Sequence, residues 1–369
     1  MQSLAVGGYT ARQIEDVLLS KGGGREIAFR FDLLDKNDGI IGELDQCAGS
    51  VAHNAFAEIK GTSRFSVKRN ITDDINWYSE RIQPYMRLKM PGGWVEWSLG
   101  VYLANAPAKQ SSGKSNVYEI EGYDKAQVLK EDKILARTTI AAGTNYVNAI
   151  VQTLNSAGII KTNITPSAAV TVSPVEFEPY TPKLEVVNTL LAALNYTSIS
   201  FDAYGYAVAK PYVEPSDRAV DYEYRTGEYS IIKPGIQRGI DMFNLPNVFV
   251  RYVSNPDRVL RSTYTLDDAA NPLSTISRGR HIVDPQEVKD IADQTTLDAY
   301  TRRAAIDGSR VFEDFTFATT LMPHHTDMDC LYLYHKDFSS DVVIETGWSM
   351  DLKAGGDMTH NARKVVRYA

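Results

Sequence analysis

The spacing of apolar residues changes its period early in the chain. In residues 10–21, Ile14, Val17 and Leu18 are spaced for one face of a helix, and three glycines follow at 22–24. The pattern therefore predicts a short amphipathic helix that ends at a flexible joint. A glycine-rich phosphate loop is the alternative, but such a loop follows a strand and precedes a helix, and the order here is reversed.

From residue 25 the apolar residues follow the period of a strand. Phe29, Phe31 and Leu33 occupy every second position, and a turn-like segment follows at 35–39. Five or six short strands in about a hundred residues predict a small antiparallel barrel or sandwich. Further strands are expected at 58–68, 85–90, 94–104 and 116–123.

The middle of the chain, residues 131–215, combines both periods. Thr144 is expected to cap a helix that ends at Gly158, and Pro182 is expected at the first position of a second helix. These features predict a compact α+β segment inserted between two β regions. Its strands are expected at 198–203 and 206–210.

The last region returns to strands, with one helix expected at 296–306 and stopped by Gly308. The predicted fold class is mainly β with an α+β insert. The expected strands are 247–253, 261–266, 312–319, 330–334, 341–352 and 364–368. The predicted domains are a helical extension at 1–24, a first β domain at 25–130, the α+β domain at 131–215 and a second β domain at 216–369.

Composition narrows the classes of function. The 369 residues are 43% hydrophobic, enough for two or three cores, and a net charge of −7 argues against tight binding to nucleic-acid phosphates. Cys47 and Cys330 are too few for a disulfide scaffold and lack the spacing of a zinc site. We expect no signal peptide and no membrane insertion, because the apolar runs are shorter than the roughly 20 residues that span a bilayer. The 21 tyrosines favour contact surfaces.

The densest group of chemically capable side chains lies at 322–330, where His324, His325, Asp327 and Cys330 occur together. This group could hold a metal ion. Adjacent histidines rarely point into one coordination sphere, however, and the sequence shows no second ligand pair at helical or hairpin spacing nearby. We therefore favour a polar turn that leads into the next strand.

Other candidates for chemistry are weaker. No nucleophile elbow occurs, and His53 and His281 stand alone in strand-loop contexts, where a hydrogen-bonded structural histidine is the more common outcome. The carboxylate pairs at 73–74 and 267–268 fall in segments where Asp residues cap turns. Trp94 and Trp97 should lie on opposite faces of a strand, which argues against a flat sugar-binding platform. We assign no catalytic, cofactor-binding or metal-ligating residue and expect no enzymatic activity.

Several segments in their order along the chain resemble the hub proteins of bacteriophage tails. The resemblance is to minor tail and baseplate hub proteins of phages that infect Gram-positive bacteria. It rests on the order of short patterned segments rather than on one motif. The segments are Tyr9-Thr10-Ala11-Arg12-Gln13-Ile14-Glu15-Asp16, residues 57–67, Ile75-Asn76-Trp77, Gly93-Trp94-Val95-Glu96-Trp97-Ser98-Leu99-Gly100-Val101-Tyr102-Leu103, residues 119–124 and Pro246-Asn247-Val248-Phe249-Val250.

The resemblance implies two small β-barrel domains like those of tail tubes, separated by smaller domains. It also implies a homotrimer whose six barrels form a pseudo-sixfold ring between the tail tube or a distal tail protein and a central spike or fibre. DNA would pass through the lumen without specific binding, and the virion would be assembled in the host bacterial cytoplasm. Two alternatives remain: a tail protein that binds wall carbohydrate or a receptor through residues such as Trp94, and a wall hydrolase that uses His324, His325 and Asp327.

Overall fold

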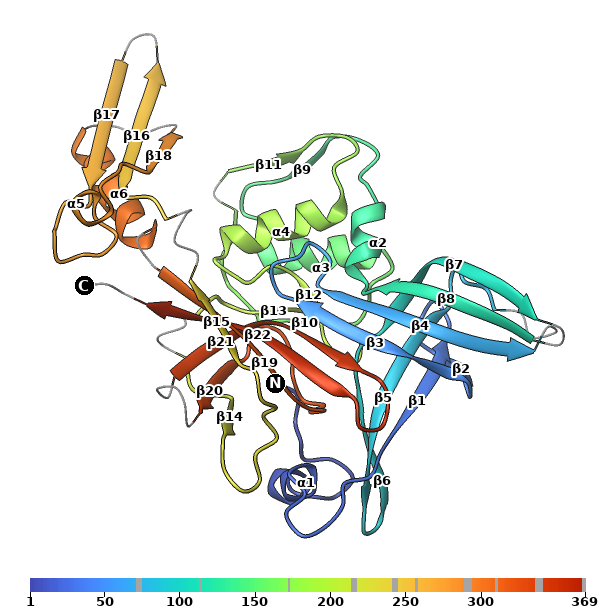
Figure 1. Ribbon diagram of the computed structural model, residues 1–369. Helices are drawn as coiled ribbons and strands as arrows, with labels where there is room; N and C mark the ends of the chain where they lie inside the picture. The colour runs from blue at the N-terminus through green and yellow to red at the C-terminus, as the bar shows by residue number, and fades with distance from the viewer. Residues whose placement is uncertain are drawn as a thin grey trace. The chain divides into compact units, whose positions relative to one another are not determined.

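The protein is mainly β, with several sheets and a small group of helices (Figure 1). Two compact units can be distinguished: one contains Met1–Gly235 and Phe317–Asn361, and the other contains Ile236–Thr316 and Ala362–Ala369. The predicted fold class, mainly β with an α+β insert, is confirmed. The computed structural model describes residues 1–70, 75–112, 115–171, 173–213, 218–240, 245–255, 258–288, 294–308, 311–335 and 341–366.

The N-terminal helix forms where the sequence predicts it but is shorter. Helix α1 (Ala11–Leu18) starts after Thr10, whose side chain accepts from the Gln13 amide, while the Gln13 side chain accepts from the Thr10 amide. This reciprocal capping satisfies two amides that a helix start leaves without partners. Ile14 and Leu18 are fully buried. The helix stops three residues before the predicted end at 21.

The first β region packs an apolar, aromatic interior. Phe65 lies between Phe31 and Tyr102 in edge-to-face contacts, with ring centroids 6.0 and 5.9 Å apart. The neighbouring strands run in the order β3-β4-β8-β7-β5-β1-β2, and β6 pairs with β5. The strands are β1 (Ile27–Leu34), β2 (Ile40–Glu43), β3 (Cys47–Asn54), β4 (Gly61–Asn70), β5 (Arg81–Met90), β6 (Gly93–Ser98), β7 (Tyr102–Ser112) and β8 (Ser115–Tyr123).

The strand predicted at 94–104 is in fact two strands, so that prediction was wrong. The chain turns between β6 and β7 at Gly100, whose φ of +125° suits glycine. A Cβ on Gly100 would lie 2.6 Å from the hydroxyl oxygen of Tyr102, so a side chain at this position would collide with Tyr102. The Tyr102 hydroxyl donates to the carbonyl of Leu99 and holds the turn closed.

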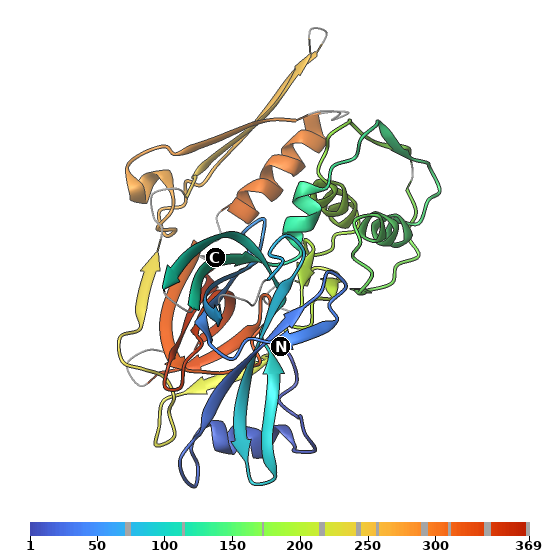
Figure 2. The same ribbon diagram turned by 90° about the vertical axis from the view of Figure 1, so that its right-hand side faces the viewer.

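The α+β segment has a core of its own, in which α3 packs against α4 (Figure 1; green in Figure 2). Asn145 caps α3, not the predicted Thr144, and Pro182 sits one position before α4 rather than at its first residue. Gly158 ends α3 with a φ of +78°, as predicted. The elements are α2 (Ala126–Glu131), β9 (Thr138–Ile140), α3 (Tyr146–Ser156), β10 (Thr162–Ile164), β11 (Val175–Phe177), α4 (Lys183–Ala193), β12 (Ser200–Phe201) and β13 (Ala207–Ala209).

Among the described residues, the last β region joins the first through the pair of strands β3 and β21. Strand β21 runs antiparallel to β3, with Trp348 opposite His53 and Gly347 opposite Asn54. A Cβ on Gly347 would lie 2.7 Å from the carbonyl oxygen of His53, so this junction requires a glycine. Strand β20 pairs with β21 and, in parallel, with β14. The strands are β14 (Tyr222–Arg225), β19 (Val311–Thr320), β20 (Cys330–Tyr334), β21 (Asp341–Asp351) and β22 (Asp357–Val366).

The second unit contains a three-stranded sheet, β17-β16-β18, that contacts α6. Asn247 is buried, and its side chain binds the backbone of Leu273, Arg280 and Ile282. Gly308, predicted to follow the helix, is its last residue. The elements are β15 (Gln237–Ile240), β16 (Val248–Asn255), β17 (Arg258–Thr265), α5 (Thr275–Arg278), β18 (Val283–Glu287) and α6 (Gln294–Gly308).

The sheets are open among the described residues, and the longest strand order runs from β15 to β2 without closing. Both predicted β regions contribute to it. The predicted domain boundaries after residues 24, 130 and 215 stay predictions.

Candidate functional site

A buried polar cluster lies inside the last β region. His325 comes from the turn before β20, Glu345 from β21 and His360 from β22. One nitrogen of each ring and one oxygen of the carboxylate lie within 4.8 Å of one another, and all three side chains are at most 1% exposed. The strand pairing explains this convergence, because β21 pairs with both β20 and β22 in the sheet.

Hydrogen bonds hold each member of the cluster in place. Nδ1 of His325 lies 2.6 Å from one oxygen of Glu345, and Nδ1 of His360 lies 2.6 Å from the other. The outer nitrogens contact hydroxyl groups, with Nε2 of His325 2.6 Å from Tyr224 and Nε2 of His360 2.8 Å from Thr319. The carboxylate therefore bridges two imidazoles, and the hydroxyl groups on their outer nitrogens fix the orientations of the rings.

Burial disfavours charge throughout this cluster. It lowers the pKa of His325 to about 4 and lowers the pKa of His360, although the neighbouring Glu345 opposes the second shift. Burial also raises the pKa of Glu345 to about 7, against the effect of its hydrogen bond with His360. At neutral pH the imidazoles are therefore biased towards their uncharged forms. Two neutral imidazoles and one carboxylate can ligate a transition-metal ion or share protons.

The sequence-predicted group at 322–330 is split by the fold. His325 enters the cluster, whereas His324 packs edge-on against Tyr222 and has no hydrogen-bond partner for either ring nitrogen among the described residues. Asp327 points elsewhere, with one oxygen 3.2 Å from Nζ of Lys60. Cys330 is a free, buried cysteine at the start of β20.

Asp327 lines a cavity of about 310 Å³ in the first unit. His53 stacks on Trp348 and places Nε2 3.8 Å from Asp327. Burial lowers the pKa of His53, which keeps this pair from being a strong ion pair. These contacts give His53 a structural role.

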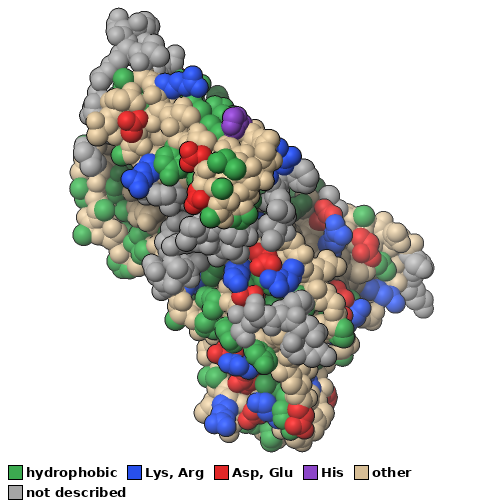
Figure 3. Space-filling view, turned by 60° about the vertical axis from the view of Figure 1, so that its left-hand side comes forward, with side chains coloured by type: hydrophobic (Ala, Val, Ile, Leu, Met, Phe, Trp, Pro, Cys, Tyr) green, Lys and Arg blue, Asp and Glu red, His purple; other side chains and the backbone are tan. Residues whose placement is uncertain are grey.

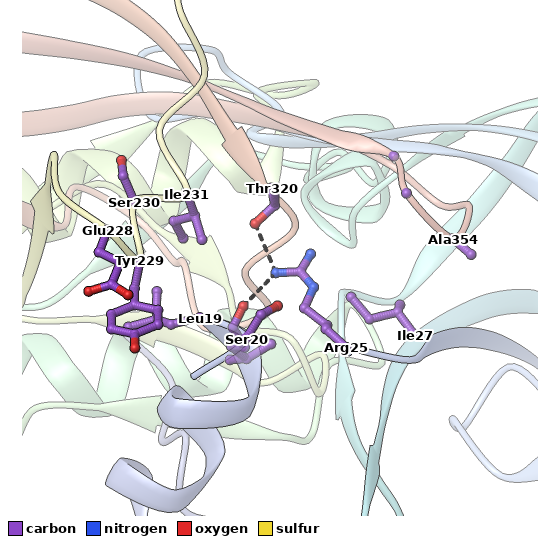
Figure 4. Close-up of a pocket in the computed structure, with 13 residues that line it drawn as sticks. Leu19, Ser20, Arg25, Ile27, Glu228, Tyr229, Ser230, Ile231, Thr320 and Ala354 are labelled. Carbon is purple, nitrogen blue, oxygen red and sulfur yellow. Dashed lines mark hydrogen bonds between the residues drawn. The ribbon is translucent and has the colours of Figure 1, made fainter. Parts of the chain in front are cut away.

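A second cavity, of about 640 Å³, opens beside the end of α1 (Figure 4). One guanidinium nitrogen of Arg25 donates both to the carbonyl of Leu18 and to the hydroxyl of Thr320. A cation at the last carbonyls of a helix is favourable, so Arg25 closes α1 and ties it to the end of β19. Glu228 and Tyr229 line the opposite part of the cavity.

The tryptophans lie on opposite faces of β6, as predicted. Trp97 is buried, and its indole N–H donates to the carbonyl of Ser3. Trp94 is half-buried, with the cations of Arg87 and Lys89 5.2 and 5.3 Å from its ring centre. Trp94 therefore already contacts two cations. Carbohydrate binding at this residue stays a prediction.

The other sequence candidates have local roles. Asp268 accepts from the amide of Ala270, which confirms a turn-capping role. Cys47, like Cys330, is free. The carboxylate pair at 73–74 lies outside the described residues.

The surface offers no large patch of one charge on the face that Figure 3 shows, because acidic and basic side chains are interspersed there. Within the described part of the chain, helices are too short or too polar to cross a bilayer.

Sequence reasoning missed Glu345, His360, Tyr224 and Thr319. The signal that could have identified them is a polar residue at a strand position whose alternating neighbours are apolar and buried. His360 lies between the buried Met358 and Ala362 at a spacing of two.

Comparisons with known proteins give a consistent result at the level of the fold. No protein-family model and no curated protein sequence matches the chain. A tail protein from Neisseria meningitidis MC58 matches with a TM-score of 0.63 and 11% identity, over 91% of this chain and 97% of that one. The 43 kDa tail protein of prophage MuSo2 from Shewanella oneidensis matches with a TM-score of 0.60 and 10% identity, over 92% and 98%.

A chain of the lidded PdpA-VgrG complex of Francisella also matches, with a TM-score of 0.58 and 10% identity, over 95% of this chain and 56% of that one. Identities this low establish shape rather than activity. The resemblance to tail proteins is confirmed in this sense, and the chain has the fold of a phage or prophage tail protein.

Proposed function

We propose that the chain is a structural hub subunit of a phage tail tip or baseplate and has no enzymatic activity. Three copies would form a pseudo-sixfold ring that joins the tail tube or a distal tail protein to a central spike or fibre. The observation that carries this proposal is that one chain contains two β regions, β1–β8 and β19–β22 with β14, joined edge to edge through β3 and β21. Three such chains supply six β regions, which is the number that a sixfold tube requires.

The acidic balance supports the proposed channel. A net charge of −7 disfavours attachment to DNA phosphates, so DNA can pass without being held. The proposed setting is the virion tail tip, after assembly in the host cytoplasm.

The exposed strand β2 is the part of the first unit that we propose for the ring contact. All four of its residues are exposed, and Ile40 and Ile41 are 66% and 53% exposed. Among the described residues it pairs with β1 along one edge only. An apolar strand with an open edge is a template for pairing with another chain.

The test is the oligomeric state of the full chain, measured by sedimentation velocity and mass photometry over a range of concentrations. We expect a species of about three times the 41.0 kDa chain mass. Ile41→Asp should convert it to monomer without lowering the melting temperature, because the residue is exposed within the chain. Leu135→Asp, at the 84% exposed Leu135 of the α+β segment, is the matched control and should remain trimeric. A wild-type chain that stays monomeric both alone and in the assembled particle would refute the proposal.

A further inference from the structure

The hydrogen bonds around His360 leave the contact between its Nδ1 and Glu345 without a proton from the neutral ring. The Thr319 hydroxyl donates to the carbonyl of Thr320 at 2.8 Å, and the same oxygen lies 2.8 Å from Nε2 of His360. A hydroxyl carries one proton, and while that proton goes to Thr320 this oxygen accepts from His360, which places the ring proton on Nε2. Nδ1 of the neutral ring then presents a lone pair to the Glu345 oxygen 2.6 Å away.

Two acceptors at this distance need a positive charge between them. Among the described residues, the ion-pair partners of Glu345 are His325 and His360, and neither a lysine nor an arginine pairs with it. An uncompensated carboxylate at full burial is strongly unfavourable. The charge is therefore supplied by a shared proton or by a bound cation.

The arrangement of the second imidazole favours a bound cation. A shared proton requires only His360 and Glu345. In the structure, Nδ1 of His325 approaches the other oxygen of the same carboxylate at 2.6 Å, so three ligand atoms from separate parts of the sheet converge. We propose that His325, Glu345 and His360 bind a divalent transition-metal ion, with Zn²⁺ the best match for two imidazoles and a carboxylate.

The surroundings suit such a site. With the metal bound, both rings would carry their proton on Nε2 and donate it to the oxygens of Tyr224 and Thr319, the arrangement by which outer hydrogen bonds orient metal-binding histidines. Phe317 stacks on His360 with ring centres 4.6 Å apart. Asp329 has an oxygen 3.8 Å from Nδ1 of His325 and is a source of a fourth ligand, although its oxygens also accept from Thr326 and from the amino group of Met1. A closed set of protein ligands is typical of a structural zinc site.

This inference goes beyond the proposed function and does not depend on it. The first experiment measures metal in the full chain, purified through a tag without histidine, by mass spectrometry of the elements. We expect about one zinc or other first-row transition-metal ion per chain. Glu345→Gln and the double variant His325→Gln/His360→Gln should lose it, whereas His281→Gln, an exposed histidine of the second unit, should retain it.

A second experiment covers the case in which those variants fail to fold. Wild-type protein is unfolded in guanidinium with a chelator and refolded with Zn²⁺, with Mg²⁺ or with neither. We expect protein refolded with Zn²⁺ to have a higher melting temperature than protein refolded with Mg²⁺ or with no metal. Protein refolded with Co²⁺ should show the visible absorption of a low-symmetry site. The proposal would be overturned if wild-type protein carried less than about a tenth of an ion per chain and its melting temperature did not change with Zn²⁺. The charge would then be assigned to a shared proton.

Discussion

The interiors of the two β regions are built differently. Around Phe65 in the first region, aromatic and aliphatic side chains pack mainly by shape, and the hydroxyl of the neighbouring Tyr102 donates to the backbone of Leu99. Around Glu345 in the last region, the interior holds a carboxylate and two imidazoles whose contacts must all be satisfied at once. The difference shows that similar strand patterns can be stabilised by dispersion and burial in one place and by a polar network in another.

The largest expected effect comes from removing the aromatic centre of the first region. Phe65→Ala should lower the free energy of unfolding by about 3–5 kcal/mol, because a large buried ring is replaced by a cavity. Denaturant titration measures this loss, which should be equal at pH 6 and pH 8. Tyr78→Ala, at a fully exposed ring, is the control and should stay within about 0.5 kcal/mol of wild type. A loss for Phe65→Ala as small as that of the control would contradict an apolar core at this position.

In the last region, removing one hydroxyl should be enough to destabilise the protein. Tyr224→Phe deletes the partner of His325 Nε2 and leaves a fully buried nitrogen unsatisfied, at a cost of about 1–3 kcal/mol. Denaturant titration again measures the loss, and Tyr78→Phe provides the exposed control. If Tyr224→Phe were as stable as wild type, the polar network would not contribute to stability as the comparison requires.

A pH experiment tests an exception inside the first region. Asp124 follows β8 and is buried, and desolvation raises its pKa to about 6 even though the amides of Gly61 and Ala126 donate to it. A raised pKa in the folded state means that the protonated form is favoured. The contribution to stability is therefore present below the unfolded pKa near 4 and is lost as the pH rises through about 6.

Asp124→Asn removes this titration. The variant should gain stability relative to wild type by about 1–3 kcal/mol between pH 4 and pH 7, measured by denaturant titration at both values. A difference between the two proteins that does not change with pH would show that Asp124 does not titrate in this range.

The sequence predicted local structure well and long-range contacts poorly. The strand at 330–334 matches β20, and Gly158 ends α3 as expected, because period and turn chemistry depend on neighbouring residues. By contrast, the sequence near either strand does not indicate that β3 pairs with β21. Conversely, the predicted single strand at 94–104 overlooked the positive φ of Gly100.

The candidate site was missed for the same reason. His325 was identified, but its partners lie 20 and 35 positions later, and only the register of the sheet brings them to it. The strand expected at 364–368 began too late, since β22 starts at Asp357, so His360 was not placed on a strand. Residues 367–369 lie outside the described part of the chain.

The pairing of β3 with β21 has a consequence for synthesis on the ribosome. Strand β3 emerges early, but the partner for its free edge is translated only after Asp341. At about 5–20 residues per second, this edge stays unpaired for tens of seconds during translation. An unpaired strand edge promotes aggregation, and contacts so distant in sequence form slowly. We therefore expect nascent chains of this protein to be prone to aggregation at that edge until the last strands emerge.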